Sequence, residues 1–321
     1  MVGKALIFGI SGQDGAYLAR HLLDKGYEVH GTSRDADLAT FSKLKSLGIL
    51  ERVTTHSATT TDFRSVFQAI TRVGPSEIYN FAGQSSVGLS FGQPAETMES
   101  NVMGTLNILE AMRMLGGGIR FYNACSSECF GNTGEGAADE QTLFRPRSPY
   151  AVAKAAAFWE VANYREAYGL FACSGILFNH ESPLRPTRFV TSKIINAVHR
   201  IAQGSSEKLT LGKLGIRRDW GWAPEYVDAM ARMLRLDAPE DFVIATGEDN
   251  SLEDFVAQAF AEIGKDWRQF VVIDSALFRP SDLDVSRGNP AKAQKKLGWC
   301  ASTHMQGVVR KMLDATKLEA Q

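Results

Sequence analysis

Short apolar runs alternate with amphipathic stretches along the first half of the chain. The apolar runs have the length of buried strands and cover residues 4–10, 27–33, 77–83 and 119–126. The amphipathic stretches carry apolar residues at helical spacing and cover residues 15–26, 65–74 and 101–116. Strands and helices that alternate in this way form parallel strands joined by right-handed crossovers. The pattern therefore predicts an α/β fold built on a doubly wound parallel sheet.

The second half of the chain is less regular. A long helix is predicted over 148–169, with Ser148 as its cap and Pro149 in its first turn, and a strand follows over 171–179. Polar, arginine-bearing loops come next, over 180–189, 211–222 and 278–285. Such loops rarely fill a core, so we expect a smaller mixed α/β domain that lies over the carboxyl edge of the sheet. The predicted division is 1–178 plus about 221–246 for the first domain, and about 179–220 plus 247–321 for the second.

Charge and composition exclude several classes of protein. The 321 residues include 35 Lys and Arg against 36 Asp and Glu, which gives no basic surplus for a nucleic-acid partner. No run of 18 apolar residues exists and the first residues show no signal-peptide pattern, so we expect a cytoplasmic protein without a membrane span. The histidines and cysteines show no metal spacing. The four cysteines, Cys125, Cys129, Cys173 and Cys300, are expected to be buried thiols.

A glycine-rich turn joins the first strand to the first helix. Gly9, Gly12 and Gly15 stand three residues apart, and glycine accepts the positive φ that a tight turn requires. The free N–H groups at the start of the following helix suit a pyrophosphate. The turn predicts a Rossmann-type dinucleotide site. Its expected cofactor-binding residues are Gly9, Ser11, Gly12, Gln13, Asp14 and Gly15.

The end of the second strand bears on which dinucleotide binds. An NAD site usually has an acidic residue there for the ribose 2′-hydroxyl, whereas this chain has Thr32 and Ser33, followed by Arg34. An arginine suits a 2′-phosphate, so the sequence favours NADP. Asp35 and Asp37 keep NAD possible, and Arg34 has the alternative of a solvated surface charge.

A tyrosine and a lysine share one face of the predicted helix 148–169. Tyr150 and Lys154 are four residues apart. A tyrosine beside an ammonium and a cationic nicotinamide loses its proton more easily, and can then act as a general base on a sugar hydroxyl. A Tyr/Lys pair alone is common on helix surfaces. Here it is joined to the glycine turn and to Ser126, Ser127 and Glu128 at a strand end, a combination that chance rarely produces.

Several segments together resemble the GDP-mannose 4,6-dehydratases of the extended short-chain dehydrogenase/reductase family. They are "GISGQDGAYLARHLLDKGYEVHG", "RFYNACSSECFG", "RPRSPYAVAK", "GILFNHESPLR", "RRDWGWAPEYVDAM" and "RPSDLDV" with "GNPAKAQKKLGW". The resemblance extends nearly from end to end of the chain. The "NHESP" and "RDWG" segments are more specific than the glycine turn, because general members of the superfamily lack them.

The resemblance implies a hydro-lyase reaction on a nucleotide sugar. Ser126 would hydrogen-bond the sugar 4-hydroxyl while Tyr150 removes its proton and C4 gives a hydride to NADP. Lys154 would hold the nicotinamide ribose. Glu128 would take the proton from C5 and protonate the departing 6-hydroxyl, before the hydride returns to C6. The alternative role for Glu128 is an ion pair with a nearby arginine, Arg145 or Arg147.

The resemblance also implies the binding residues. Further cofactor contacts are expected from Asp62, Ala82 and Gln84. Substrate contacts are expected from Ser85, Ser127, Asn179, Arg185, Lys193, Lys213, Arg218 and Arg279, of which Arg218 and Arg279 would hold the pyrophosphate. His180 and Glu181 are expected to shape their loop through hydrogen bonds rather than to act in catalysis.

The chain departs from the family pattern at several positions. The paired arginines and serines that grip the 2′-phosphate and help to build a tetramer are missing after the second strand, and Thr59 replaces an aspartate that contacts adenine. Lys213 replaces an asparagine near the base, and Asp282 replaces a glutamate. The resemblance implies GDP-mannose as the substrate. The last two departures touch substrate recognition and leave another GDP-linked hexose or heptose open.

Two other functions compete with the dehydratase. An epimerase or reductase of the same family would share Tyr150 and Lys154 but would not need Glu128. A non-catalytic NADP-binding protein would usually lack the tyrosine or the lysine. A homodimer or homotetramer is expected, in which the helix from Ser148 and the helix before it pair across a two-fold axis through the "AAAFW" face.

Overall fold

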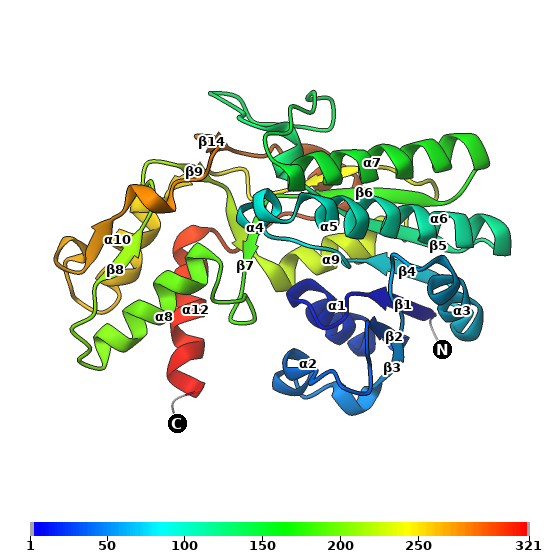
Figure 1. Cartoon of the computed structure of the whole chain (residues 1–321), viewed down its shortest axis with the longest axis horizontal. Helices are drawn as coiled ribbons and strands as arrows, with labels where there is room; N and C mark the ends of the chain where they lie inside the picture. The colour runs from blue at the N-terminus through cyan, green and yellow to red at the C-terminus, as the bar shows by residue number, and fades with distance from the viewer. Residues whose placement is uncertain (1–2, 320–321) are drawn as a thin grey trace.

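The computed structural model describes residues 3–319 and is dominated by a seven-stranded parallel sheet (Figure 1). The strand order is β11-β6-β5-β4-β1-β2-β3, and every neighbouring pair is parallel. The strands are β1 Lys4–Phe8, β2 Glu28–Ser33, β3 Val53–Ser57, β4 Glu77–Asn80, β5 Arg120–Ser126, β6 Ala172–Leu177 and β11 Phe242–Ile244. The order reverses between β1 and β4, as in a doubly wound sheet, so the predicted fold class is confirmed.

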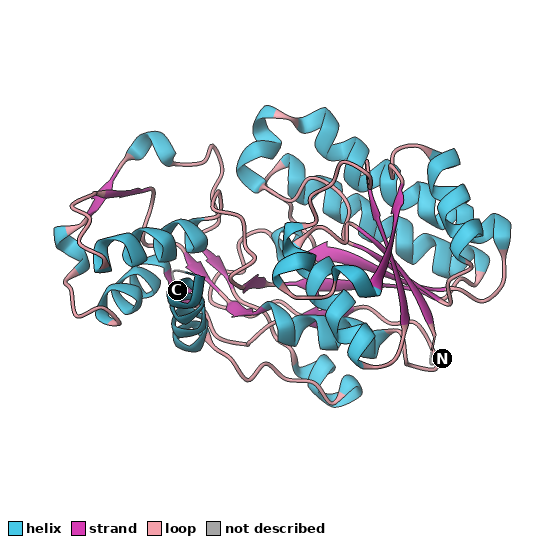
Figure 2. Ribbon diagram, turned by 90° about the horizontal axis from the view of Figure 1, so that it is seen from below, coloured by secondary structure: helices cyan, strands magenta, loops and turns pink. Residues whose placement is uncertain are grey.

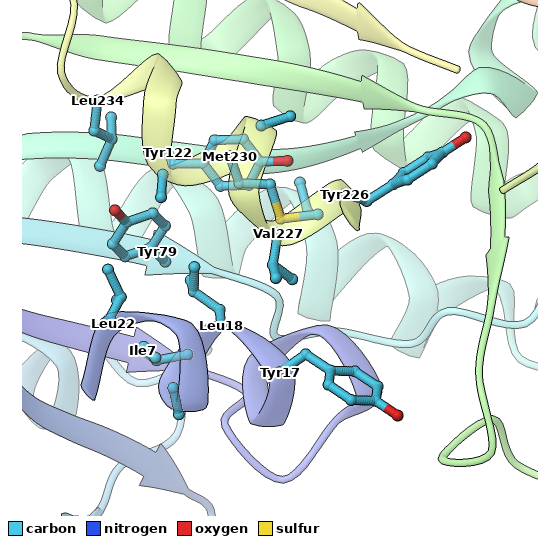
Figure 3. Close-up of a cluster of buried hydrophobic side chains, with 14 of the residues drawn as sticks. Ile7, Tyr17, Leu18, Leu22, Tyr79, Tyr122, Tyr226, Val227, Met230 and Leu234 are labelled. Carbon is cyan, nitrogen blue, oxygen red and sulfur yellow. The ribbon is translucent and has the colours of Figure 1, made fainter. Parts of the chain in front are cut away.

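Helices cover both faces of this sheet (Figure 2). One face carries α1 (Gln13–Asp24) and α9 (Ala223–Met233), and Figure 3 shows Leu18 and Met230 of these helices converging over the strands. The other face carries α3 (Phe63–Val73), α6 (Gly104–Leu115) and α7 (Pro149–Tyr168). The strands β1, β4, β5 and β6 are thus buried on both sides, which explains why their sequences read as largely apolar runs, whereas the edge strand β3 is only partly covered.

A smaller mixed α/β part lies beside the large sheet. Its hydrophobic cluster includes Ile194, Phe255 and Val308, from α8 (Val190–Ala202), α10 (Leu252–Ala261) and α12 (Met305–Glu319). Three small sheets accompany it: β7 Asn179–Glu181 with β10 Trp220–Trp222; β9 Arg217–Arg218 between β12 Asn250–Ser251 and β14 Val285–Ser286; and β8 Leu209–Leu211 with β13 Val271–Ile273. The two-part architecture agrees with the predicted fold class, and the exact domain boundaries stay a prediction.

Shorter helices complete the chain. They are α2 Ser42–Ser46, α4 Val87–Gly92, α5 Pro94–Met98 and α11 Ala291–Leu297, the 3-10 helices η1 Leu50–Arg52, η3 Ser127–Phe130, η4 Trp267–Gln269 and η5 Ser275–Leu277, and the π-helical turn η2 Glu99–Met103. No helix between residues 3 and 319 combines the length and apolar character needed to cross a membrane.

Three details differ from the sequence-based expectations. The strand predicted over 171–179 leaves the large sheet after Leu177, and its last residue begins β7, which pairs with β10 instead. The helix predicted over 101–116 is continuous with the π-helical turn η2, so its α-helical part begins only at Gly104. Cys125, Cys129 and Cys173 are buried as expected, whereas Cys300 is exposed, because it follows the end of α11 on the surface.

The glycine turn is tight because its backbone atoms approach one another closely. Gly9 has φ +84°, and the Gly12 N–H donates to the Gly9 carbonyl oxygen at 3.0 Å. A Cβ at Gly15 would lie 2.4 Å from the same oxygen. Only glycine therefore lets α1 start this close to β1.

We predict that Gly15→Ala lowers the free energy of unfolding by about 1–3 kcal/mol, because the added methyl must displace backbone. Gly92→Ala is the matched control, since nothing lies within 4 Å of a Cβ there and Gly92 is helical. Urea unfolding of both variants measures the difference. Equal stability of the two variants would contradict the prediction.

Candidate active site

A strand end and a helix start bring four polar side chains together. Ser126 ends β5, and its hydroxyl accepts the Glu128 N–H at 3.3 Å, which starts η3. Ser148 caps α7 by accepting the Ala151 N–H at 3.1 Å, as predicted. The first two turns of α7 then carry Tyr150 and Lys154 toward the same strand end. Local capping by two serines therefore fixes the backbone on both sides of the cluster.

The tyrosine and the lysine are almost fully buried. Both are 9% exposed, and the Lys154 Nζ donates to the Ala124 carbonyl oxygen at 2.9 Å. The same Nζ lies 5.9 Å from the centre of the Tyr150 ring. Burial lowers the pKa of Lys154 and raises the pKa of Tyr150, while the neighbouring Ser126 hydroxyl acts in the opposite direction on Tyr150. Tyr150 is thus protonated until further positive charge arrives beside it.

The carboxylate of Glu128 faces the same cavity and forms no ion pair within the described part of the chain. Burial raises the pKa of Glu128, Arg218 and Arg279 oppose this rise, and Asp282 adds to it. The alternative of an ion pair with Arg145 or Arg147 is wrong, because the cations that influence Glu128 come from β9 and from the loop before β14. A raised pKa makes the carboxylate a better proton acceptor than an exposed glutamate.

These groups line a cavity of about 460 Å³ between the large sheet and the smaller part. All of the predicted catalytic and substrate-binding residues border it: Ser85, Ser126, Ser127, Glu128, Tyr150, Lys154, Asn179, Arg185, Lys193, Lys213, Arg218 and Arg279. The sequence-based set is therefore one spatial cluster, although its members are spread over much of the chain. Their individual contacts with a ligand stay predictions.

Arginines dominate the far end of this cavity. Arg218 is 5% exposed and donates to the Leu283 carbonyl oxygen at 2.8 Å and to Asp282 at 3.3 Å. Arg279 lies 3.8 Å from the same carboxylate. Two guanidinium groups sharing one carboxylate leave a net positive charge, which suits a doubly charged pyrophosphate.

Two lysines border the same end of the cavity, and protein groups hold both of them. Lys193 donates to the Thr210 carbonyl oxygen at 2.7 Å, and Lys213 pairs with Asp284 at 2.6 Å.

The start of α1 is tied to segment 180–182 of the smaller part. Gln13 donates to the His180 carbonyl oxygen at 3.2 Å and accepts from the Ser182 hydroxyl at 2.7 Å. His180 Nε2 lies 3.0 Å from the Asp14 carboxylate, and its Nδ1 lies 2.7 Å from the Phe178 carbonyl oxygen. Both ring nitrogens thus face acceptors, which favours the doubly protonated, charged imidazolium. Gln13 and Asp14 link the two parts of the protein, and their predicted contact with a cofactor stays a prediction.

His180 and its neighbour shape the loop as expected. Glu181 accepts from the Thr191 hydroxyl at 2.7 Å and pairs with Arg185 at 3.3 Å. Arg185 in turn lies over the Phe189 ring at 3.9 Å. The segment is therefore held by its own side chains before any ligand binds.

The other residues predicted for the cofactor lie along the carboxyl edge of the sheet. A Cβ at Gly9 would lie 2.9 Å from the Ala82 nitrogen, so the turn packs directly against the backbone that follows β4. No side chain caps α1, which leaves its first N–H groups available. Gln84 bonds the Ser86 carbonyl oxygen, Asp62 caps α3, and Arg34 is exposed beyond β2. The uncapped start of α1 and the polar side chains along this edge of the sheet are suited to binding a dinucleotide.

Sequence reasoning missed Lys43 and Arg188. The Lys43 Nζ donates to the Ser11 carbonyl oxygen at 3.0 Å, and Arg188 borders the cavity. Neither residue belongs to a motif, and α2 is too short to show a period. Only the folded chain brings them to the glycine turn. Within residues 3–319 no group of three or more His, Cys, Asp and Glu side chains could hold a metal ion.

The parallel sheet, the glycine turn and the Ser126–Tyr150–Lys154 cluster define an extended short-chain dehydrogenase/reductase. Comparison with known proteins narrows this class. The family model described as GDP-mannose 4,6 dehydratase matches residues 6–312, and the chain belongs to this family.

Several relatives are similar over nearly the whole chain. GDP-mannose 4,6 dehydratase 2 of Arabidopsis thaliana is 44% identical over 320 residues, covering 97% of this chain and 86% of the relative. GDP-mannose 4,6 dehydratase of Homo sapiens is 42% identical, with 97% and 90% covered.

Solved structures share the fold. UDP-glucose 4-epimerase of Thermus thermophilus in complex with NAD has a TM-score of 0.85 at 26% identity, with 98% and 99% covered. RMD from Pseudomonas aeruginosa complexed with NADPH has a TM-score of 0.81 at 21% identity, with 99% of each chain covered, and shows the fold alone.

We predict that the Asp14–His180 pair makes stability depend on pH. Burial lowers the pKa of His180, but Asp14 outweighs burial and the net shift is upward. Burial likewise raises the pKa of Asp14, but the charge and hydrogen bond of His180 bring it down to about 2. A raised histidine pKa stabilises the fold below the unfolded pKa of about 6.5, and this contribution is lost as pH rises through the folded pKa.

The free energy of unfolding of the wild type should therefore exceed that of His180→Gln by more at pH 6 than at pH 9. Asp14→Asn is the reciprocal variant and should remove the same dependence. Urea unfolding across this range measures both variants. A difference between wild type and His180→Gln that does not change with pH would contradict the prediction.

Proposed function

We propose that this protein is a hydro-lyase that converts GDP-mannose to GDP-4-keto-6-deoxymannose and uses NADP as its cofactor. The observation that carries the proposal is the carboxylate of Glu128, which shares a cavity with Tyr150 and Lys154 and has no cation bound to it in the described part of the chain. Oxidation and reduction need only the tyrosine and the lysine. The removal of water needs an additional acid–base group, and Glu128 supplies it.

The side chains divide the proton transfers between them. When bound, the dinucleotide accepts the hydride from C4 of the sugar and returns it to C6. Tyr150 takes the proton of the 4-hydroxyl, Ser126 orients that hydroxyl, and the Lys154 ammonium stabilises the tyrosinate. Glu128 accepts the C5 proton, which the new 4-keto group makes acidic, and gives it to the 6-hydroxyl as that group leaves as water. As the hydride returns to C6, C5 takes up a proton, which balances the proton that Tyr150 removed from the 4-hydroxyl, so the net change is the loss of one water.

The cations of the cavity bind the nucleotide. Arg218 and Arg279 hold the pyrophosphate. Both lie at the far end of the cavity, and Asp282 is the one carboxylate with which both of them pair. Asn179, Arg185 and Lys193 approach the sugar or its phosphates from β7 and α8. The remaining contacts come from Ser85, Ser127 and Lys213 at the cavity wall.

NADP is proposed over NAD on the chemistry at the end of β2. Thr32 is buried there and Ser33 is half-buried, and no carboxylate occupies their place. Arg34 follows and is exposed, in position for a 2′-phosphate. The adenosine and ribose would contact Asp62, Ala82 and Gln84. The pyrophosphate would lie along the turn from Gly9 to Gly15.

Two structural proposals accompany the function. The first is the division into a dinucleotide-binding domain of 1–178 plus about 221–246 and a substrate domain of about 179–220 plus 247–321. A hydrophobic cluster within the second range supports it, although Ala293, Leu297 and Trp299 of that range pack against the large sheet's core. The second is a homodimer or larger homo-oligomer. Trp159 is 63% exposed and Val152 44% exposed on α7, while Met103, the last residue of η2 before the neighbouring helix α6, is 45% exposed. A second copy of this face would cover these side chains.

We predict that Glu128→Gln slows water loss about 10²–10⁴-fold, the range of a general acid–base contribution. Dinucleotide binding should not change, because Glu128 lies outside the glycine turn. The product is followed by its mass, lower by one water, and by its absorbance in alkali. Glu135→Gln, an exposed glutamate after the same strand, is the control. Unchanged dehydration by Glu128→Gln would refute the proposal, and stoichiometric NADPH consumption by the wild type would indicate a reductase.

We predict that Trp159→Glu shifts the protein toward a monomer, because it places a charge in the proposed interface. Sedimentation velocity measures the assembly. Ile273→Glu changes a similarly exposed side chain on β13 and should leave the assembly intact. A wild type that sediments as a monomer would refute the interface.

A further inference from the structure

Lys43 and Arg188 lie near the glycine turn without a carboxylate partner. Lys43 donates to the Ser11 carbonyl oxygen at 3.0 Å, which is a neutral acceptor. Neither residue forms an ion pair with any described residue. Burial lowers the pKa of Lys43, and the charge of Arg188 lowers it further, so the two cations repel each other. Asp14 is close enough to oppose this effect, but its carboxylate is bound to His180.

The fold holds Lys43 in this unfavourable place. Lys43 is the second residue of α2, a helix of five residues. Phe41 and Leu44 on either side of it are buried in the main core. Phe41 has φ +45° and is the only non-glycine residue with positive φ among residues 3–319, a conformation that costs free energy for an aromatic residue. The chain thus accepts backbone strain to anchor α2 beside the turn.

An anion beside Ser11 would explain this arrangement. The residues after β1 and β2 are neighbours, because Phe8 pairs with Thr32 in the sheet. The ribose 2′ position of a bound dinucleotide lies at the end of β2 in this fold. Lys43 approaches that place from the side of Ser11, and Arg34 approaches it from the strand itself.

We propose that Lys43 binds the 2′-phosphate of NADP and selects it against NAD, with Arg188 adding positive charge from the loop before α8. This inference rests on the proposed function, and it assigns the cofactor choice mainly to α2 rather than to Arg34. When the 2′-phosphate binds, the Lys43 ammonium exchanges its hydrogen bond to the neutral Ser11 carbonyl for charge-assisted hydrogen bonds to a dianion. The phosphate also removes the repulsion between Lys43 and Arg188.

Fragment binding to the protein without added cofactor tests the inference independently of turnover. The probes are 2′,5′-ADP and 5′-AMP, which differ only in the 2′-phosphate, measured by calorimetry. Lys43→Ala should weaken 2′,5′-ADP about tenfold, as expected for one lost charge-assisted contact, and should change 5′-AMP less than about twofold. Lys43→Arg should retain most of the affinity. Lys45→Ala removes an exposed lysine of the same helix and is the matched control.

The outcomes separate this inference from the proposed function. A wild type that binds 5′-AMP as tightly as 2′,5′-ADP would overturn both the NADP assignment and the role of Lys43. A wild type that prefers 2′,5′-ADP, together with Lys43→Ala that keeps this preference, would overturn the role of Lys43 alone. Equal weakening of both fragments would also overturn it, because Lys43 would then act by supporting the turn.

Discussion

The contact between the start of α1 and segment 180–182 determines where the cavity lies. Asp14 and His180 are separated by 166 residues yet lie 3.0 Å apart, and Gln13 and Ser182 add a second link. The His180 ring also stacks on Tyr226 of α9 at 4.7 Å. The segment that leaves the sheet after β6 is thereby fixed on the dinucleotide side of the protein. Polar pairs of this kind, fully satisfied and buried, specify one arrangement rather than several.

This tie brings the arginines to the cavity that Glu128 faces. β7 pairs with β10, and Arg218 stands two residues before Trp220, the first residue of β10. Positioning β7 therefore positions Arg218, whose charge reaches Glu128 on the far side of the cavity. Burial holds the pKa of Glu128 above its usual range, and the arginines keep it from rising further. A carboxyl group in such surroundings holds its proton to a higher pH than an exposed glutamate, which is the property that the proposed proton transfer requires.

The sequence predicts the parts of this arrangement that depend on local patterns. Alternating periods predict the sheet and its helices, the Ser148–Pro149 pair predicts the start of α7, and the motifs predict the residues of the cavity. Contacts between distant polar residues carry no period, so the Asp14–His180 tie and the position of Lys43 could not be predicted. The departure of the chain from the sheet at Phe178 was also missed, because an apolar run continues through it. There the backbone of Phe178 still bonds to Ile244, and the following residues find a new partner strand.

Burial differs sharply between the two ends of the cavity. Tyr150 and Lys154 are 9% exposed and stand on α7, whose serine cap and core contacts fix them. Lys213 and Asp284 form a largely exposed pair, and such pairs contribute little to stability. Two of the positions at which the chain departs from the family pattern, Lys213 and Asp282, belong to this second end. The packed end fixes the reaction, whereas the loops at the open end can change which nucleotide sugar is recognised without cost to the core.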